Sequence, residues 1–598
     1  MKSKIKIAVA SPTIKLCNPE YNAIACIDTA KTADDAGADI VVFPELVLCG
    51  ATAGDLYRQE LLIEACESAL EKYIKETASL SVMSFIGAPL FLNGNLYNAV
   101  VCVSEGEILG VTVSGEHSRI FCIAPEKAFF ADVCGTKTEI GRNLIYTDAD
   151  TRASIFVKVG DDDAYSADGV NIILNPVSMA EYVGLAKARR GYVNEISAAL
   201  GVCFVLAGAG WGESGTDGIF AAPRLISQGG EIVCEAPLFS TELLYADVDL
   251  SKNKKCVTAI NADEESLSRY PFVPEKADEL SDACVLALEL QSRALALRLD
   301  RAYGKTAVIG VSGGLDSTLA VLVAVKAMDI LGKSRSDVIA ITMPCFGTTE
   351  RTKGNALALA EELGCSVRTI DIKKSVNQHF EDIAHDSNSY DVVYENAQAR
   401  ERTQILMDIA NAENGLVIGT GDLSELALGF ATYNGDHMSM YCVNGSIPKT
   451  FMRAIIKNEA ENYEKTGKAV LSKVLLDIVN TPVSPELLPV ENGENKQHTE
   501  QIVGPYELHD FFLYYTVKYG YSPKKILGLA TSVFTEYKED EIRGYLDTFV
   551  RRFFSQQFKR SCLPDGPRVT EISLSPRGAW QMPSDISSEL WRKAIKEK

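Results

Sequence analysis

A glycine- and serine-rich turn between two apolar segments constrains the fold of this chain most strongly. Residues 311–317 read Val-Ser-Gly-Gly-Leu-Asp-Ser, after the apolar stretch 306–310 and before the apolar-periodic stretch 318–328. The two glycines let the backbone approach an anion, and the helix that follows points unpaired N–H groups at it. The sequence therefore predicts a strand, a phosphate-binding turn and a helix, which together indicate a nucleotide-binding α/β unit.

The residues of this turn distinguish it from other phosphate-binding loops. It is not a Walker loop, because no Gly-Lys-Ser/Thr follows at the required spacing. The form Ser-Gly-Gly-x-Asp-Ser resembles the pyrophosphate loop of enzymes that cleave ATP to AMP and pyrophosphate. The structural alternative is a glycine-rich turn in an ordinary α/β unit that binds no ligand.

Length and composition bound the class of protein. A chain of 598 residues is too long for one typical core, so we expect two or more large domains. The 59 basic and 80 acidic residues give a net charge of -21, which argues against a nucleic-acid or membrane surface. The 15 cysteines form no CxxC pair, and no leader or long apolar run is visible. We therefore expect a cytoplasmic protein with reduced thiols.

The hydrophobic pattern predicts two α/β domains joined by a linker. In residues 1–250, a helix is expected near 21–36 and strands at 5–10, 40–43, 84–87, 99–103, 153–159, 171–174, 203–207 and 243–247. The polar stretch 251–282, with two prolines in 270–274, is interpreted as the linker. Residues 283–598 begin with a helix, and further strands are expected at 338–343, 366–371 and 416–419. Strands that alternate with helices indicate a parallel sheet that binds its ligand at the carboxyl ends of the strands.

Seven further segments make the second domain more specific. They are Met-Pro-Cys-Phe-Gly-Thr (343–348), Tyr-Glu-Asn-Ala-Gln-Ala-Arg (394–400), Gly-Thr-Gly-Asp-Leu-Ser-Glu (419–425), Pro-Lys-Thr (448–450), Ser-Pro-Glu-Leu-Leu (484–488), Gly-Pro-Tyr-Glu-Leu-His-Asp (504–510) and Gln-Phe-Lys-Arg (557–560). In order and spacing they resemble the synthetase domain of the glutamine-dependent NAD synthetases, from the linker nearly to Asp585. This resemblance implies a doubly wound parallel sheet that is Rossmann-like and similar to the adenine nucleotide alpha hydrolases.

The resemblance also implies a reaction and its partners. Members of that family adenylate the nicotinate carboxylate of deamido-NAD with ATP, and ammonia then displaces AMP to form the amide of NAD. Mg²⁺ prefers oxygen ligands, and it bridges protein carboxylates to phosphate oxygens. The resemblance gives this metal role to Asp316 and Glu425, although Asp316 could instead cap a helix and Glu425 could be a solvated carboxylate. A homodimer or larger homo-oligomer is implied as well.

The remaining site residues are also implied by the resemblance. ATP contacts fall on Ser312, Gly313, Gly314, Leu315, Asp316, Ser317 and Thr420. Deamido-NAD contacts fall on Asn396, Glu425, Phe430, Ala431, Thr432, Tyr433 and Lys559. The resemblance gives catalytic roles to Asp316 and Lys559. Lys449 could also neutralise phosphate, but we favour Lys559 for this role. The alternative for either lysine is an exposed surface cation. Phe430 stands where the family typically has tryptophan, so an aromatic face is kept. His437 and His509 receive no role.

Residues 1–250 resemble the nitrilase-like glutaminase domain of the same family, an α/β/β/α sandwich. The matching segments are 43–46, 95–99, 175–178 and 187–190. Activity in that family depends on a Glu, a Lys and a nucleophilic Cys. The Glu is present as Glu45, but Ser114 stands near the expected lysine and Gly160 near the expected cysteine. No cysteine occurs between Cys134 and Cys203.

These departures predict a pseudo-glutaminase, since amide cleavage through a thioester requires a thiolate. Glu45 would then be a relic or a structural residue, and ammonia would come free or from a partner. The alternative is a genuinely glutamine-dependent enzyme whose nucleophile has moved to Cys49 or Cys122. Two alternatives belong to other classes: a different amidating or thiolating member of the pyrophosphate-loop group, and a non-enzymatic binding or scaffold protein with both halves inactive.

Overall fold

The chain folds into two compact units. The computed structural model describes residues 4–116, 118–148, 151–161, 169–253, 255, 267–347, 350–481 and 504–596. The N-terminal unit comprises 1–181, 185–214 and 219–262, and the C-terminal unit comprises 182–184, 215–218 and 263–598. The domain boundaries predicted at 250 and 283 stay a prediction, because 254 and 256–266 of the expected linker lie outside the described residues. The Ser-Pro-Glu-Leu-Leu segment (484–488) also lies outside them.

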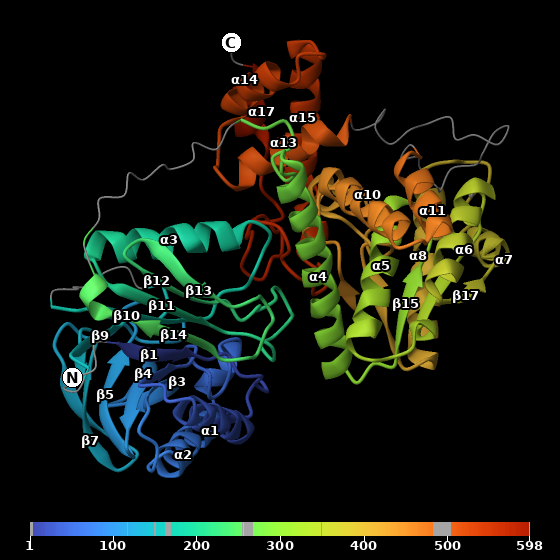
Figure 1. Cartoon of the computed structure of the whole chain (residues 1–598). Helices are drawn as coiled ribbons and strands as arrows, with labels where there is room; N and C mark the ends of the chain where they lie inside the picture. The colour runs from blue at the N-terminus through green and yellow to red at the C-terminus, as the bar shows by residue number, and fades with distance from the viewer. Residues whose placement is uncertain are drawn as a thin grey trace. The chain divides into compact units, whose positions relative to one another are not determined.

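The N-terminal unit contains two β-sheets (Figure 1). The eight-stranded sheet has the order β14-β1-β2-β3-β4-β5-β7-β6, with bounds Leu244–Val248, Ile5–Val9, Ile40–Val42, Met83–Leu92, Asn95–Ser104, Glu107–Val113, Thr136–Gly141 and Phe129–Val133. The six-stranded sheet has the order β13-β12-β11-β10-β9-β8, with bounds Glu231–Glu235, Arg224–Gln228, Cys203–Gly208, Ile172–Val177, Ala153–Val157 and Ile145–Asp148. Ile7 and Val42 of the first sheet share one buried core with Ile155 and Leu174 of the second, so the sheets pack face to face.

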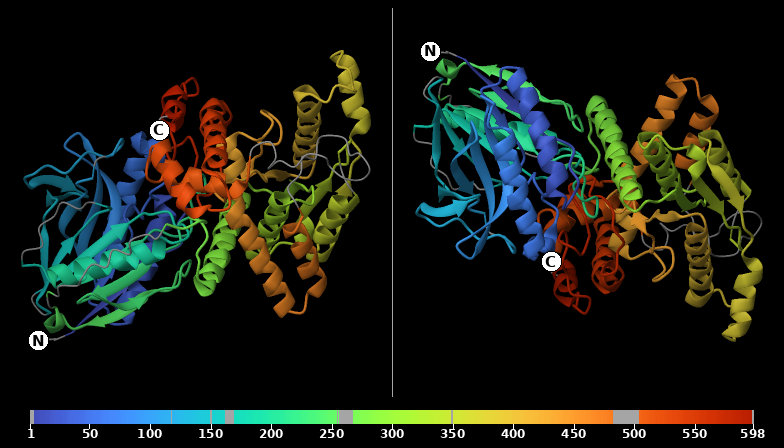
Figure 2. Two further views of the ribbon diagram at one scale, coloured as in Figure 1. Left: turned by 90° about the horizontal axis from the view of Figure 1, so that it is seen from above. Right: turned by 90° about the horizontal axis from the view of Figure 1, so that it is seen from below.

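Helices cover the outer faces of both sheets. Helices α1 (Pro19–Asp35) and α2 (Glu60–Glu76) lie side by side on the eight-stranded sheet (Figure 2). Helix α3 (Leu185–Leu200) packs on the six-stranded sheet through Val193. The short 3-10 helices Gly54–Arg58 and Leu250–Lys252 complete the unit. This arrangement is the predicted α/β/β/α sandwich, which is therefore confirmed.

The hydrophobic pattern missed six strands of this unit, namely β5, β6, β7, β8, β12 and β13. The strands expected at 84–87 and 99–103 are longer than predicted, because β3 and β4 pair over their whole length around a turn at Asn93 and Gly94, both with positive φ. Strands β6 and β7 were not predicted, since each has exposed residues at alternate positions and polar or charged residues among them. Such polar strands give a weak hydrophobic signal.

The C-terminal unit contains a five-stranded parallel sheet. Its order is β17-β16-β15-β18-β19, with bounds Ser366–Thr369, Val338–Thr342, Thr306–Gly310, Gly415–Gly419 and Tyr441–Cys442. Helices α5 (Leu315–Ile330) and α6 (Glu350–Leu363) contact each other, whereas α7 (Lys373–Asp382) and α8 (Val392–Ala412) share a core with Val308 and Ile341. The doubly wound parallel sheet is thus confirmed.

The remaining helices complete the unit, and those formed by 506–517, 523–533, 539–555 and 589–596 pack together as a group apart from the sheet (Figure 1). They are α4 (Ala277–Arg301), the 3-10 turn Arg335–Asp337, α9 (Leu423–Leu428), α10 (Lys449–Lys465), α11 (Ala469–Val479), α13 (Tyr506–Val517), α14 (Pro523–Val533), α15 (Glu539–Ser555), α16 (Gln557–Arg560) and α17 (Glu589–Lys596). Helix α4 begins at Ala277 rather than at 283, and Asp278 and Glu279 lie in its first turn, where acidic groups favour a helix start. Among the described residues, no helix combines the length and apolar character that a membrane span requires.

Candidate active site

The phosphate-binding turn adopts the geometry that its glycines predict. It connects the end of β15 to α5, and Gly313 has φ +84°. A Cβ at Gly313 would lie 2.1 Å from the carbonyl oxygen of Thr352, so only glycine fits there. Gly314 N donates to Ser312 Oγ at 3.2 Å, and Ser312 N donates to Ser317 Oγ at 3.3 Å. These bonds fix the turn where α5 begins.

A cavity of about 480 Å³ lies at this turn and at the carboxyl ends of β15, β16 and β18. Thirteen residues predicted for the synthetase site line it: Ser312, Gly313, Gly314, Leu315, Asp316, Ser317, Asn396, Thr420, Glu425, Phe430, Ala431, Thr432 and Lys559. Tyr433 is not among the lining residues; its ring is 42% exposed and stacks on His437. The structure thus gathers residues from segments that are far apart in the sequence.

Behind the cavity, one lysine meets three carboxylates. Lys449 Nζ lies 2.7 Å from Asp316 Oδ1, 2.5 Å from Asp422 Oδ2 and 3.2 Å from Glu425 Oε1. Burial disfavours the charge of Lys449, but the attraction of Asp316, Asp422 and Glu425 outweighs it and raises its pKa well above the ordinary value. Burial raises the pKa of Glu425 to about 7, although Lys449 opposes that rise. The lysine therefore holds its proton and fixes the three acids.

The three carboxylates fit a divalent metal ion. One oxygen each of Asp316, Asp422 and Glu425 lies within 4.8 Å of the others. When all are ionised, three carboxylates and one ammonium leave two negative charges, and hard oxygen ligands suit Mg²⁺. Asp422 also caps α9, because its Oδ1 accepts from Glu425 N at 2.8 Å. Sequence reasoning missed Asp422, although it follows β18 and immediately precedes a helix, where a carboxylate points at the ligand-binding edge.

Other residues predicted for deamido-NAD form a second part of the cavity lining. Thr432 Oγ1 donates to Asn396 Oδ1 at 2.8 Å. Lys559 Nζ donates to the carbonyl oxygens of Gly429, at 2.8 Å, and Ala431, at 2.6 Å. These contacts hold the segment 429–432 as one wall. Burial and the neighbouring Arg552 lower the pKa of Lys559.

Phe430 lies on the same wall beneath a cation. The guanidinium of Arg552 lies 5.6 Å from the centre of the Phe430 ring. His437 Nδ1 is 2.9 Å from the Thr432 carbonyl oxygen, and His509 is 1% exposed between aromatic rings. Both histidines therefore have structural contacts, in agreement with the absence of a predicted role.

A second cavity, of about 210 Å³, lies in the N-terminal unit and is lined by Glu45, Ser114 and Gly160. Glu45 follows β2 and accepts from Asn98 Nδ2 and from Ser178 N, both at 2.6 Å. A Cβ at Gly160 would lie 3.3 Å from Glu45 Oε2. The three positions that the resemblance aligned with a glutaminase triad thus surround one cavity.

Two of these positions lack the required chemistry. The described residues that line the cavity include no cysteine and no lysine. Cys49 does not line it: its Sγ is buried against the Leu46 and Gly50 carbonyl oxygens, at 3.6 and 3.5 Å, and burial raises its pKa well above the ordinary value. Cys122 does not line it either and is exposed, with Sγ 3.6 Å from Asn95 Oδ1. Neither thiol is placed to attack a ligand beside Glu45.

Comparison with known proteins identifies the family. Residues 289–522 match the NAD synthase family and residues 6–151 the carbon-nitrogen hydrolase family. The chain is 33% identical to the glutamine-dependent NAD(+) synthetase of Mycobacterium tuberculosis (strain ATCC 25618 / H37Rv), over 98% of this chain and 97% of that one.

Two solved structures share the fold of the whole chain. The glutamine-dependent NAD(+) synthetase from Cytophaga hutchinsonii superposes with a TM-score of 0.79 at 19% identity, covering 99% of both chains. The enzyme from Acinetobacter baumannii, in complex with adenosine diphosphate, gives 0.65 at 20% identity and covers 97% of this chain and 98% of that one. The chain therefore belongs to the glutamine-dependent NAD(+) synthetases, and its function is NAD biosynthesis by ATP-dependent amidation.

Proposed function

We propose that the C-terminal unit activates deamido-NAD with ATP and Mg²⁺ and amidates it with ammonia that the N-terminal unit does not release from glutamine. One observation supports the proposed synthetase activity above all. The carboxylates of Asp316, Asp422 and Glu425 lie close together at the edge of the cavity that contains the phosphate-binding turn. Hydrogen-bond donors for phosphate, carboxylates and an aromatic side chain therefore line a single cavity.

The chemistry requires such a combination. A carboxylate is a poor electrophile, so the nicotinate carboxylate must first attack the α-phosphorus of ATP, which releases pyrophosphate and forms a mixed anhydride with AMP. Ammonia then attacks the activated carbonyl carbon, AMP leaves with the bonding electrons, and one proton is lost from nitrogen. The site must hold the two reactants in line and cancel phosphate charge. When bound, Mg²⁺ would neutralise phosphate oxygens beside Asp316, Asp422 and Glu425.

The residues of this chain divide that work. N–H groups of the turn 312–317 and the N-terminus of α5 bind phosphate. Lys449 does not line the cavity; it positions the three carboxylates from behind them. Asn396, Thr432 and Phe430 hold the dinucleotide, and Lys559 keeps the segment 429–432 in place through two backbone carbonyls.

The choice of nitrogen donor follows from the second cavity. Glu45 is present there, but Ser114 and Gly160 provide neither the cation nor the thiolate that amide cleavage needs. The relatives are called glutamine-dependent, so the competing proposal is a nucleophile supplied by Cys49 or Cys122. The burial of Cys49 and the position of Cys122 outside the cavity favour the loss of glutaminase activity.

One experiment tests both halves of the proposal. The purified full chain would be incubated with ATP, Mg²⁺ and deamido-NAD, and with either L-glutamine or ammonium chloride, while NAD, AMP and glutamate are measured. We expect NAD and AMP with ammonium and no glutamate with glutamine. Equal turnover with glutamine would refute the inactive-glutaminase proposal, and Cys49→Ser and Cys122→Ser would then show whether either thiol is responsible. The homodimer and the cytoplasmic location stay predictions.

A further inference from the structure

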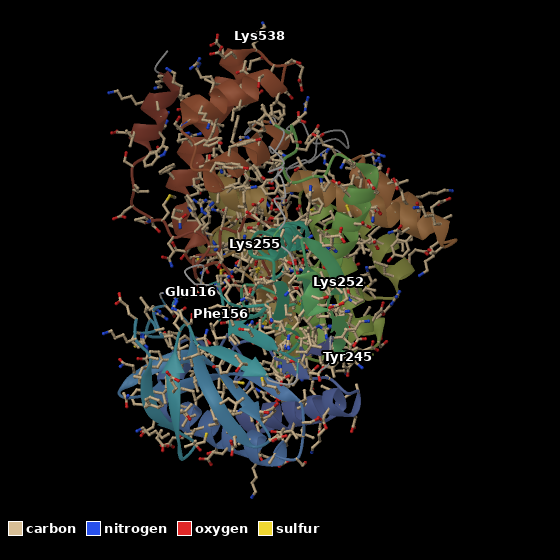
Figure 3. The ribbon with its side chains drawn as sticks, turned by 60° about the vertical axis from the view of Figure 1, so that its left-hand side comes forward. Glu116, Phe156, Tyr245, Lys252, Lys255 and Lys538 are labelled. Carbon is tan, nitrogen blue, oxygen red and sulfur yellow. The ribbon has the colours of Figure 1, made fainter. Side chains whose placement is uncertain are left out.

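The cavity beside Glu45 is acidic in a way that its likeness to a glutaminase does not explain. Three carboxylates line it, from Glu45, Glu116 and Asp161, and none of its described lining residues is a lysine, arginine or histidine. Glu45 and Glu116 approach the same point, because a Cβ at Gly160 would lie 3.3 Å from Glu45 Oε2 and 3.1 Å from Glu116 Oε2. Glu116 lies at one end of the β-sandwich (Figure 3). The cavity therefore concentrates negative charge.

A buried acceptor in the same cavity also lacks a donor. Asn98 is 8% exposed and lines the cavity; its Nδ2 donates to Glu45 Oε2 at 2.6 Å. Its Oδ1 is buried and has no hydrogen-bond partner among the described residues. Buried polar groups without a partner are uncommon in folded proteins. The partial negative charge of this oxygen adds to that of the carboxylates, and no donor offsets it.

We propose that this cavity binds a small organic ammonium cation, with its charged nitrogen between Glu45 and Glu116. An ammonium group offers three donors and has no acceptor, which matches a wall of acceptors. The other lining residues include Leu46, Phe121, Val177 and Met179, which would contact a short carbon chain. The volume of about 210 Å³ restricts the ligand to a small molecule.

Two other classes of ligand fit the cavity less well. A divalent metal ion needs carboxylate oxygens gathered closely, and among the described residues only Asp316, Asp422 and Glu425 do so. An amino acid such as glutamine carries its own carboxylate, which would lie among three others with no cation from the described lining residues. The structure therefore favours an amine without a carboxylate.

The pKa of Glu45 agrees with the proposed binding of a cation. Burial and, to a smaller extent, the neighbouring Glu116 carboxylate raise the pKa of Glu45 to about 7, although hydrogen bonds from Asn98 and Ser178 oppose that rise. The unliganded cavity thus disfavours a further negative charge. A bound cation would relieve the repulsion between the two carboxylates.

Calorimetric titration of the full chain with n-butylammonium chloride, at pH 8 and constant ionic strength, tests the proposal. We expect saturable binding, none with n-butanol, and no competition from L-glutamine. Glu116→Gln removes a charge from an exposed lining residue and should weaken binding at least about tenfold, since charge-assisted hydrogen bonds are the stronger ones. Glu107→Gln, an exposed position on β5 that does not line the cavity, is the matched control and should leave affinity unchanged.

Several results would overturn the proposal. They are the absence of saturable binding, equal affinity for n-butanol, competition by L-glutamine, displacement of the amine by Mg²⁺, and an equal loss of affinity in Glu116→Gln and Glu107→Gln. Should Glu116→Gln fail to fold, Asp161→Asn provides the same test, because Asp161 is a second exposed lining residue.

Discussion

Replacing Glu425 with glutamine should stabilise the metal-free protein while it destroys the site. Glu425 has a side chain that is 21% exposed and lies 3.2 Å from Lys449. Burial raises the pKa of Glu425 from 4.5 to about 7 against the attraction of Lys449. A carboxyl with a raised pKa keeps its proton in the folded state after the unfolded chain has lost it. The free energy of unfolding therefore falls as the pH rises from about 4.5 to about 7.

The size of this effect follows from the two pKa values. They differ by about 2.5, and each pH unit of difference is worth about 1.4 kcal/mol. The cost to the folded state is therefore about 3 kcal/mol above pH 7, and partial exposure of the side chain reduces it toward 2. Glutamine has nearly the same shape and no charge. Glu425→Gln should thus be about 2 to 3 kcal/mol more stable at pH 8 and less than about 1 kcal/mol more stable at pH 5.

Differential scanning calorimetry in EDTA at pH 5 and pH 8 would measure this difference. A gain of about 2 to 3 kcal/mol raises the Tm of a large domain by roughly 5 °C. Glu361→Gln, at an exposed position of α6, is the control and should shift the Tm little at either pH. The Glu425→Gln variant should also form no NAD from ammonium. An unchanged or lower Tm at pH 8, or an equal rise at pH 5, would refute the electrostatic reasoning.

Three further substitutions and one chelation test the synthetase site. Asp316→Ala should lower AMP release by at least about 100-fold, because it removes a carboxylate from the proposed metal site; an unchanged rate of pyrophosphate release would contradict this. Gly313→Ala forces a Cβ to 2.1 Å from the Thr352 carbonyl oxygen, so urea unfolding should show a loss of at least about 1 kcal/mol and ATP titration a weaker affinity. Phe430→Leu removes the ring beneath Arg552 and should raise the KM for deamido-NAD several-fold, whereas Phe430→Trp should not. EDTA should abolish turnover and excess Mg²⁺ restore it; full activity in EDTA would exclude a metal requirement.

The fold could be predicted where the strands are apolar and buried on both faces. Strand β15 was predicted at its observed bounds, and β16 and β18 within one residue of theirs, because parallel strands form continuous apolar runs. The polar strands β6 and β7 gave no comparable signal, since they alternate exposed and buried residues. The hydrophobic pattern is therefore most exact for strands that are buried on both faces and least informative for strands with polar residues at alternate positions.

The site could be predicted where short motifs carry the chemistry. The turn 312–317 and the segment 430–432 line one cavity, as expected. The arrangement of Lys449 against Asp316 and Asp422 could not be predicted, because these residues come from α10, α5 and the turn before α9, and only the tertiary fold buries them together. A lysine in a sequence looks like a surface cation until its neighbours are known.

The backbone at Gly160 and the contacts of Glu45 show which parts of the second cavity the fold itself requires. Gly160 has φ +67°, its N–H donates to the Pro176 carbonyl oxygen at 2.9 Å, and its own carbonyl accepts from Asn175 Nδ2 at 2.9 Å. This backbone is held by neighbouring groups and needs no side chain at 160, and its left-handed conformation favours glycine over cysteine. Glu45, in contrast, ties Asn98 to the Ser178 backbone, so it contributes to the fold whether or not it acts on a substrate. Its presence is therefore no evidence of glutaminase activity, whereas the absence of a thiol at Gly160 bears directly on that activity.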